Sequence, residues 1–311
     1  MVRAVAQRVG IALFVVWGTA TLVFFLIRLA PGDPAILLVG PTGTAAQIEA
    51  ARKSLGLDQS MLVQYWRFLQ NLVVLNFGYS TRLGESATTL VLQRIPATAE
   101  LAGAAALIGT AVGFPLGVVA GRRPGSRIAR FVTASSLTLQ SLPGFWVGVM
   151  LILVFSRNLH LFPSSGRTGF SSLILPASAL AIQLVGVIAR LTQSGLTGVL
   201  NDPFMQTARA KGIGENAVIR GHGIRNMLIP VVTVVGLQLG ALLGGAVIIE
   251  SVFSWPGLGQ LLIDGISNRD YSVVQAATVF IALIVALANM TVDLMYAVLD
   301  PRIRRSKVKA R

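Results

Sequence analysis

The chain of 311 residues is strongly apolar, with 54% hydrophobic residues, 12% charged residues and a mean hydropathy of +0.72. Soluble domains carry about 25% charged residues, so this composition excludes an ordinary soluble protein and indicates a membrane protein. Cysteine is absent, which excludes disulfides, Fe–S clusters and thiolate metal sites. The net charge of +14 could suggest nucleic acid, but cytoplasmic loops of membrane proteins are rich in Lys and Arg, so no nucleic-acid partner is expected.

Six apolar stretches predict an all-α integral membrane protein with six transmembrane helices. Each has about 20 residues, the length that crosses a hydrocarbon core of about 30 Å. The first is too long for the apolar region of a signal peptide, so we expect it to be retained. Residues 1–311 are treated as a single transmembrane domain. The expected spans are 9–29, 95–121, 131–155, 173–191, 227–250 and 272–299.

Positive charge predicts the orientation of the spans. Most of the 26 Lys and Arg residues lie near the N-terminus, after the second span, after the fourth span and in the C-terminal tail. The two short loops on the opposite side hold only Arg157, Arg167 and Arg269. Because cytoplasmic loops carry the excess of positive charge, both termini and the loop 192–226 are expected in the cytoplasm.

The segment 30–94, between the first two spans, is expected to be extracytoplasmic and partly helical. A shorter helix is expected near 48–55, ahead of an amphipathic one. This segment could be a lid packed on the ends of the spans, or a docking platform for an external protein. The amphipathic helix is predicted by the helical spacing of Leu62, Tyr65, Trp66, Leu69 and Val73.

Two spans carry glycines at every fourth position, which form a smooth stripe that lets a neighbouring backbone approach closely. Such stripes fit static packing, and they also fit surfaces that slide when a bundle opens alternately to each side. The stripes consist of Gly109, Gly113, Gly117 and Gly121 in the second span and Gly236, Gly240 and Gly244 in the fifth.

The third span contains Pro143-Gly144 near its middle. Proline removes a backbone hydrogen bond, so we expect a kink or break, which could line a cavity or only serve packing. Several neutral polar groups in the spans could line a passage for a polar solute or form interhelical hydrogen bonds. The possible translocation path therefore comprises Gln140, Pro143, Gln183, Gln238 and Asn289.

Two carboxylates lie inside the expected spans, away from their ends: Glu100 and Asp293. Each could serve a proton relay or a structural contact, because charges within membranes are costly and usually have a role. No basic residue lies mid-span to pair with them, which argues against a proton-driven pump.

The loop after the fourth span contains signals for one short helix. Asp202 and Pro203 suit the N-cap and first helical positions, and Gly212 and Gly214 provide a stop, so a helix of about eight residues is expected. Ala208 and Ala210 permit close approach by a partner, while Arg209 and Lys211 give the helix charge. A solvated amphipathic loop is the alternative.

The chain shows no sign of catalytic chemistry of its own. No G-x-x-x-x-G-K-[ST] sequence is present, so no P-loop is available to bind ATP. The two histidines have no flanking acidic residues, which gives no metal site, and no nucleophile–base arrangement is visible. We therefore expect a protein that is not an enzyme, holds no cofactor or metal, and needs an external source of energy.

An ordered set of motifs resembles the B-type permease subunit of dipeptide and oligopeptide ABC importers, which depend on a binding protein. The resemblance covers nearly the whole chain. Three motifs precede the loop: Arg28-Leu29-Ala30-Pro31-Gly32-Asp33-Pro34, Leu55-Gly56-Leu57-Asp58 and Arg94-Ile95-Pro96-Ala97-Thr98-Ala99-Glu100-Leu101. Four follow: Thr207-Ala208-Arg209-Ala210-Lys211-Gly212, Arg225-Asn226 with Pro230, Phe253-Ser254-Trp255-Pro256-Gly257-Leu258-Gly259 and Asp300-Pro301-Arg302.

This resemblance implies the type I ABC importer permease fold and identifies 203–223 as the "EAA" coupling loop, whose helix sits in a groove of an ATPase subunit. The chain departs from the generic pattern in carrying Gln206 where the motif would begin with Glu. The distance from Gly212 to Pro230 is also longer, and Leu75-Asn76-Phe77-Gly78 replaces a Gly-Asp-x-Gly turn. The implied coupling residues are Phe204, Gln206, Thr207, Ala208, Arg209, Ala210, Lys211 and Gly212.

The resemblance further implies a heterodimer with a C-type permease in the inner membrane of a prokaryote. Two partner ATPase subunits would bind ATP and Mg²⁺, and an extracytoplasmic substrate-binding protein would deliver a peptide. The same family could instead import a nickel chelate, glutathione or haem. Other classes are an ATP-independent secondary transporter or channel, and a membrane scaffold without transport.

Overall fold

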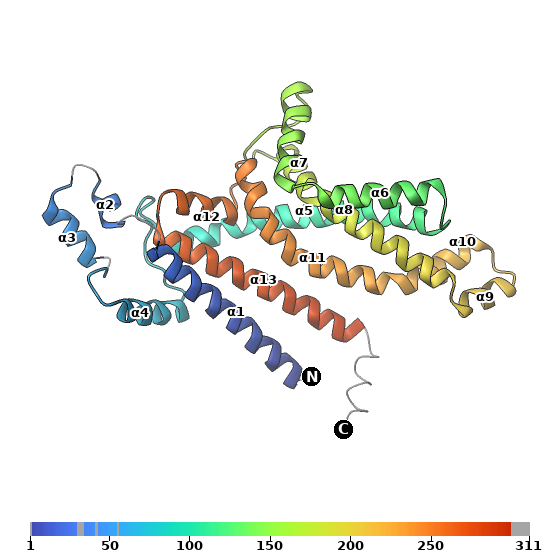
Figure 1. Ribbon diagram of the computed structural model, residues 1–311, viewed down its shortest axis with the longest axis horizontal. Coiled ribbons are helices and arrows are strands. Elements are labelled where there is room, and N and C mark those ends of the chain that lie inside the picture. Colours follow the sequence, from blue (N-terminus) through green and yellow to red (C-terminus); the bar gives the residue numbers. More distant parts are fainter. Residues whose placement is uncertain (1, 30–33, 41–42, 55, 300–311) are drawn as a thin grey trace. The chain divides into compact units, whose positions relative to one another are not determined.

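The computed structural model describes residues 2–29, 34–40, 43–54 and 56–299, and within these ranges the regular structure is helical (Figure 1). β-Pairing in the described part is limited to one isolated bridge between Tyr79 and Ser86. The expected motif Asp300-Pro301-Arg302 and parts of the two N-terminal motifs (Ala30 to Asp33, and Leu55) lie outside the described residues.

Five of the six expected spans are confirmed as continuous helices, and the expected third span corresponds to a pair of helices that together are long and apolar enough to cross a membrane. The pair is α6 (Arg127–Ser141) with α7 (Gly144–Leu151), which continues as the π-helix η1 (Ile152–Asn158); its two arms are bent by 98°. The continuous helices long and apolar enough to cross a membrane are α1 (Val2–Leu29), α5 (Ala87–Gly121), α8 (Phe170–Leu200), α11 (Arg225–Val252) and α13 (Tyr271–Leu299).

The break between α6 and α7 lies where Pro143 predicts it. Leu142 and Pro143 both have extended backbone, and Pro143 is the N-cap of α7. Proline lacks an N–H and disfavours helical conformation in the residue before it, so α6 ends at Ser141 and a new helix begins beyond Pro143.

Shorter helices fill the connections. The predicted amphipathic helix is confirmed as α4 (Met61–Val73) and the shorter one as α3 (Ala45–Ser54), whereas α2 (Pro34–Val39) and α12 (Leu258–Ser267) were not expected. The loop after α8 contains α9 (Pro203–Ala210), α10 (Glu215–Val218) and the π-helix η2 (Ile219–Ile224).

The chain divides into two compact units, and α5 and α13 contribute to both. Unit 1 comprises the described residues up to Thr98 together with Pro256–Leu287. Its core contains the buried rings of Phe24, Phe68, Phe77 and Phe280. Two buried hydrogen bonds connect distant segments of unit 1: Ser80 Oγ donates to Asp270 Oδ2 at 2.5 Å, and the Leu258 N–H donates to Thr98 Oγ1 at 2.8 Å.

Unit 2 comprises Ala99–Trp255 and the described residues from Ala288 onward, and it is organised around α8. This helix packs against α6, α7 and α11, and α5 lies alongside it (Figure 1). Residues on α8 are buried from Ser172 to Leu200, so the helix forms the centre of the unit.

The glycine stripe on α5 packs inside the chain, as do Gly236 and Gly240 of the stripe on α11, whereas Gly244 has nothing within 4 Å of a Cβ placed there. The stripe on α5 faces α8: a Cβ placed on Gly113 would lie 2.8 Å from the Val185 carbonyl oxygen, and one on Gly117 would lie 2.5 Å from that of Ala189. On α11, a Cβ on Gly240 would lie 2.9 Å from Asn289 Oδ1 of α13. The expected close approach of backbones is therefore confirmed between α5 and α8, whereas the glycines of α11 make room for side chains of α13.

Overpacking the α5 stripe should destabilise unit 2. We predict that Gly117→Leu lowers the melting temperature of the purified protein, because extra side-chain atoms in a filled interface cost about 1–3 kcal/mol. Gly103→Leu on the same helix is the matched control, since nothing lies within 4 Å of a Cβ placed there. Equal melting temperatures for the two variants would contradict this packing.

Candidate functional site

The loop between α8 and α11 carries α9, the helix that the sequence predicts as a contact for an ATPase. Its bounds, Pro203–Ala210, match the expected length of about eight residues. Asp202 is the N-cap and Pro203 the first helical residue, as expected, although the Asp202 side chain makes no capping hydrogen bond. Gly212 follows with φ +76°, a left-handed conformation that favours glycine and ends the helix.

Met205 anchors α9 to the rest of unit 2. Its side chain is fully buried, and Ala208, one turn later on the same face, is also buried. A Cβ placed on Gly223 of η2 would lie 3.2 Å from Leu196 Cδ1 of α8 and 3.6 Å from Met205 Cε. The inner face of α9 therefore packs where the end of α8 meets η2, and the bare glycine leaves room for Met205.

Arg209 fastens α9 to its neighbours by polar contacts. Its Nε donates to Glu215 Oε2 at 3.0 Å, its Nη2 donates to Glu215 Oε1 at 2.9 Å, and its Nη1 donates to the Leu200 carbonyl at the end of α8 at 3.2 Å. The hydrogen bond from Arg209 lowers the pKa of Glu215, and the same bond raises the pKa of Arg209. Because the pair is exposed, it orients the loop more than it stabilises it.

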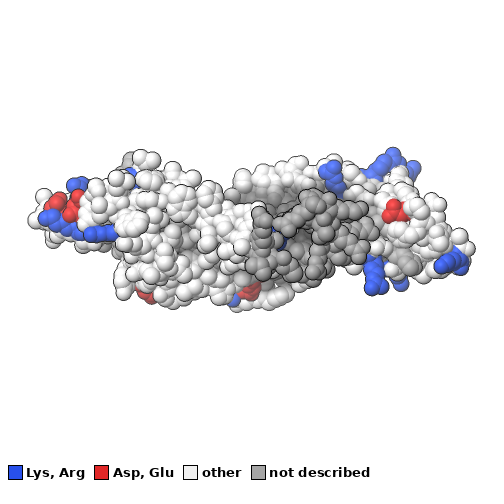
Figure 2. Space-filling view, turned by 90° about the horizontal axis from the view of Figure 1, so that it is seen from below, with Lys and Arg blue, Asp and Glu red and all other residues white. Residues whose placement is uncertain are grey.

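The outer face of α9 is open. Ala208 is turned inward and Arg209 is paired, so the expected coupling set divides into a buried and an exposed part. Figure 2 shows Lys and Arg gathered at the end of unit 2 that carries α9 and α10, on the right of the view. Apart from the paired Arg209, the exposed members of the set are Phe204, Gln206, Thr207, Ala210, Lys211 and Gly212.

Three of the five residues expected to line a path lie at the break between α6 and α7. Gln183 Nε2 of α8 donates to the Leu142 carbonyl at 2.9 Å, which satisfies a backbone group freed next to Pro143. Gln140 Nε2 donates to the Ser136 carbonyl at 3.1 Å. These glutamines act as interhelical or backbone partners, and their part in a path remains a prediction.

The other two expected path residues lie on a different helix pair. Gln238 is half-buried on α11, and Asn289 on α13 lies beside Gly240. The structure therefore does not gather all five residues in one place, and a role for these two in a path also remains a prediction.

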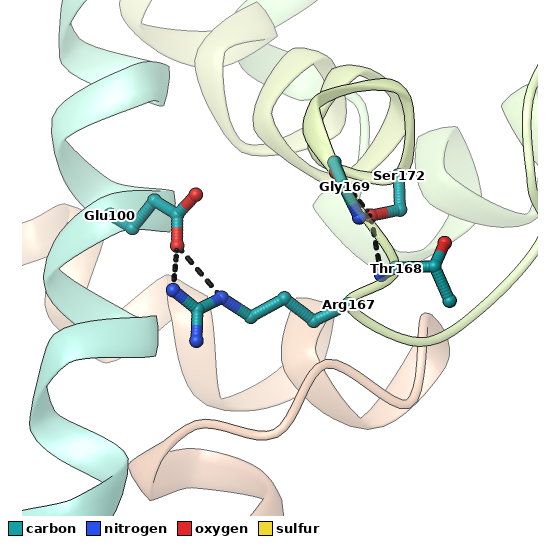
Figure 3. A network of polar contacts seen from close by, with 5 residues as sticks. All are labelled: Glu100, Arg167, Thr168, Gly169 and Ser172. Carbon is teal, nitrogen blue, oxygen red and sulfur yellow. Dashed lines mark hydrogen bonds and ion pairs between the residues drawn. The ribbon is translucent and has the colours of Figure 1, made fainter.

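Glu100 has a basic partner that does not come from a span (Figure 3). Arg167, in the connection between η1 and α8, places Nη2 2.6 Å and Nε 2.8 Å from Glu100 Oε2. The Arg167 guanidinium also lies 5.9 Å from the centre of the Trp255 ring. The N–H of the preceding residue, Gly166, donates to the Phe253 carbonyl at 2.9 Å. Glu100 thus holds this connection in place, which favours the structural reading of its carboxylate.

Two further carboxylates lie on membrane-spanning helices. Asp293 lies on α13, but its side chain is outside the described part of the structure. Glu250 on α11 is fully buried and was missed by the sequence analysis, because it is the last residue of an expected span. A single acidic residue after the apolar run Ala246-Val247-Ile248-Ile249 was the signal that could have revealed it.

Family models match nearly the whole chain. The model "Binding-protein-dependent transport system inner membrane component" matches residues 113–305, and the corresponding N-terminal model matches residues 1–102. The chain belongs to this family. Its members are transport permease subunits and not catalysts, which fits the absence of an ATP-binding motif from the sequence.

Relatives of known identity align over almost their full length. The chain is 37% identical to the oligopeptide transport system permease protein AppB of Bacillus subtilis, over 97% of this chain and 99% of the relative. It is 40% identical to the di/tripeptide permease DppB of Pseudomonas aeruginosa, over 99% and 100%. It is 39% identical to the glutathione permease GsiC of Escherichia coli K12, over 92% and 93%.

Solved structures support the fold. A chain of the MetNI methionine ABC transporter in an inward-facing conformation superposes with a TM-score of 0.58 at 21% identity, covering 68% of this chain and 96% of that one. An amino acid ABC transporter gives 0.55 at 17% identity, covering 68% and 94%. The chain is therefore a multi-pass membrane protein with the type I ABC permease fold.

The Arg209–Glu215 pair should restrain the loop that carries α9. We predict that Glu215→Gln makes the bond after Lys211 a modestly better trypsin substrate, because Arg209 loses its charged partner while the side-chain size is kept. The cleavage rate is measured on the purified full-length protein. Glu49→Gln on α3 is the control, and an unchanged rate after Lys211 in Glu215→Gln would show that the pair does not restrain the loop.

Proposed function

We propose that this chain is one of two permease subunits of an ATP-driven importer that carries di- or oligopeptides across the cytoplasmic membrane of a prokaryote by alternating access. The observation that carries the proposal is α9, a short helix seated by Met205 with its opposite face free. Full-length similarity to permeases named for oligopeptide and di/tripeptide transport supports the choice of cargo.

In this proposal α9 transmits the movement of the ATPases to the membrane helices. Two partner subunits bind ATP and Mg²⁺, close on each other and draw α9 with them. Met205 and Arg209 connect α9 to the last turns of α8 at Leu196 and Leu200. Since α8 packs against α5, α6, α7 and α11, a displacement of α9 is passed to several helices at once.

The remaining partners follow from the same proposal. A C-type permease completes the pathway, and an extracytoplasmic binding protein delivers the substrate. The excess of Lys and Arg supports an orientation with both termini and α9 in the cytoplasm and α2 to α4 outside. The similarity to GsiC gives glutathione as the second candidate cargo.

Cargo is tested by reconstituting the complete transporter in vesicles with its binding protein. Peptides of two to five residues are expected to stimulate ATP hydrolysis and to accumulate inside. Stimulation by glutathione and not by other peptides would replace the peptide assignment. Uptake by this chain without ATPase subunits, driven by an ion gradient, would refute the ATP-driven importer.

The exposed face of α9 can be blocked without disturbing the packing of its buried face. We predict that Ala210→Trp abolishes uptake in the reconstituted complex while membrane insertion and the melting temperature stay unchanged, because Ala210 is exposed. Ala208 is less suited to this test, since it is buried and a bulky side chain there would displace α9 itself.

The matched control is Ala50→Trp on α3, an exposed helical alanine far along the chain from the loop. It should transport normally. Normal uptake by Ala210→Trp would show that this face does not contact an ATPase subunit.

A further inference from the structure

Helix α4 exposes apolar side chains that neither the core nor the proposed transport cycle uses. Leu62 is 80% exposed, Trp66 63% and Val73 83%. At 3.6 residues per turn these three side chains fall within an arc of about 40°, so they form one stripe along the helix. An isolated exposed apolar residue is ordinary, but a stripe that includes a tryptophan marks an interaction surface.

The rest of α4 is divided between a core face and a polar face. The core face comprises Tyr65, Phe68, Leu69 and Leu72, which pack into unit 1. Helical geometry places Arg67, Gln70 and Asn71 on the far side, beyond the stripe. The exposed apolar stripe therefore lies between the protein core and a polar face, which is the arrangement of a helix lying at a boundary between lipid and water.

Contacts with α1 set the level of α4 along a membrane-spanning helix. The Tyr65 and Thr21 hydroxyls are 2.8 Å apart, the rings of Phe68 and Phe24 are 5.2 Å apart, and Arg28 Nε donates to Gln64 Oε1 at 3.0 Å. The apolar part of α1, Ala6–Leu29, has 24 residues. It is thus about 36 Å long, against a hydrocarbon core of about 30 Å.

All of these α1 contacts lie in its last third. They therefore place α4 beside the end of the apolar segment, close to where a spanning helix passes from the hydrocarbon core into the headgroup region. Arg28 is the basic residue in the last turn of α1, and its guanidinium carbon stacks 3.6 Å over the Phe24 ring.

The stripe borders the exposed apolar surface of a membrane-spanning helix. Tyr65 stacks on Phe25 of α1 with ring centres 5.6 Å apart, and Phe25 is exposed together with its neighbours Leu22 and Leu26. In a spanning helix such exposed residues face lipid or another membrane helix. The apolar surface of α1 therefore passes without interruption, through Tyr65, to the stripe on α4.

We propose that α4 is an interfacial helix whose stripe of Leu62, Trp66 and Val73 is covered by the lipid bilayer. Tryptophan favours the boundary between hydrocarbon and headgroups, where its ring is buried and its N–H reaches water or headgroup oxygens. Lipid is favoured over a soluble protein partner because the stripe continues the exposed apolar surface of the spanning helix α1 and lies beside the end of its apolar segment.

Spin labelling tests this proposal directly, because the natural chain contains no cysteine. Nitroxide labels are placed at Leu62→Cys, Trp66→Cys and Val73→Cys, with Arg67→Cys and Gln70→Cys as controls from the polar face. The complete transporter is reconstituted in a bilayer of phosphatidylethanolamine and phosphatidylglycerol. Collisions are then measured with oxygen, which concentrates in hydrocarbon, and with a water-soluble nickel chelate.

The three stripe positions should collide several-fold more often with oxygen than with the nickel chelate, and the two control positions should show the reverse. High nickel accessibility at all five positions would overturn the proposal in favour of a water-exposed helix. Low accessibility to both reagents along the stripe would overturn it in favour of a protein partner.

A second measurement keeps the native side chain. Brominated lipids quench tryptophan fluorescence at short range, so part of the quenching seen in the unmodified protein should be lost in Trp66→Phe. Equal quenching in the two proteins would place Trp66 outside the bilayer and contradict the proposal.

Discussion

Because α8 is buried along most of its length, its neighbours in unit 2 have to fit its surface. In its most apolar window 72% of the residues are buried, compared with 11% for α1. The fit depends on glycines, which have no side chain: at Gly113 and Gly117 the backbone of α5 lies against the carbonyls of Val185 and Ala189. Membrane helices lack a hydrophobic driving force between them, so such close contact is what holds them together.

The same helix determines where α9 sits. Met205 supplies the apolar contact with the end of α8, and fully burying a side chain of this kind contributes about 1.5–3 kcal/mol. Arg209 fixes the orientation of α9, because its guanidinium donates to the Glu215 carboxylate on one side and to the Leu200 carbonyl on the other. Helix α9 is therefore connected to the rest of unit 2 by one packed contact and one oriented polar contact.

The elements that the sequence predicts correctly are those determined by local pattern. Apolar length predicts the six spans, Pro143 predicts the break in the third, and Asp202-Pro203 with Gly212 predicts α9 nearly to the residue. These signals act within a few turns of one helix, so they can be read without knowing the fold. Helix α12 was missed because its ten residues are too short for a span and carry no cap signal that distinguishes them from a loop.

The properties of the site that depend on tertiary contacts could not be read from the sequence. Ala208 and Ala210 look equivalent there, but in the folded loop Ala208 is buried and Ala210 is exposed. Glu100 looked unpaired because its partner, Arg167, is 67 residues away in a connecting segment. The path residues Gln140 and Gln183 likewise turned out to serve backbone groups near the Pro143 break.

The central claim is that α9 presents one defined face to an ATPase subunit. Disulfide cross-linking tests it most directly, because cysteines can be introduced singly into a chain that has none. With cysteines placed along the α9-binding groove of the ATPase subunit, Thr207→Cys and Ala210→Cys should form cross-links that stop ATP-driven uptake until they are reduced, and Met205→Cys should form none. Cross-linking at Met205 as efficient as at Ala210, or no cross-link from either exposed position, would contradict the account.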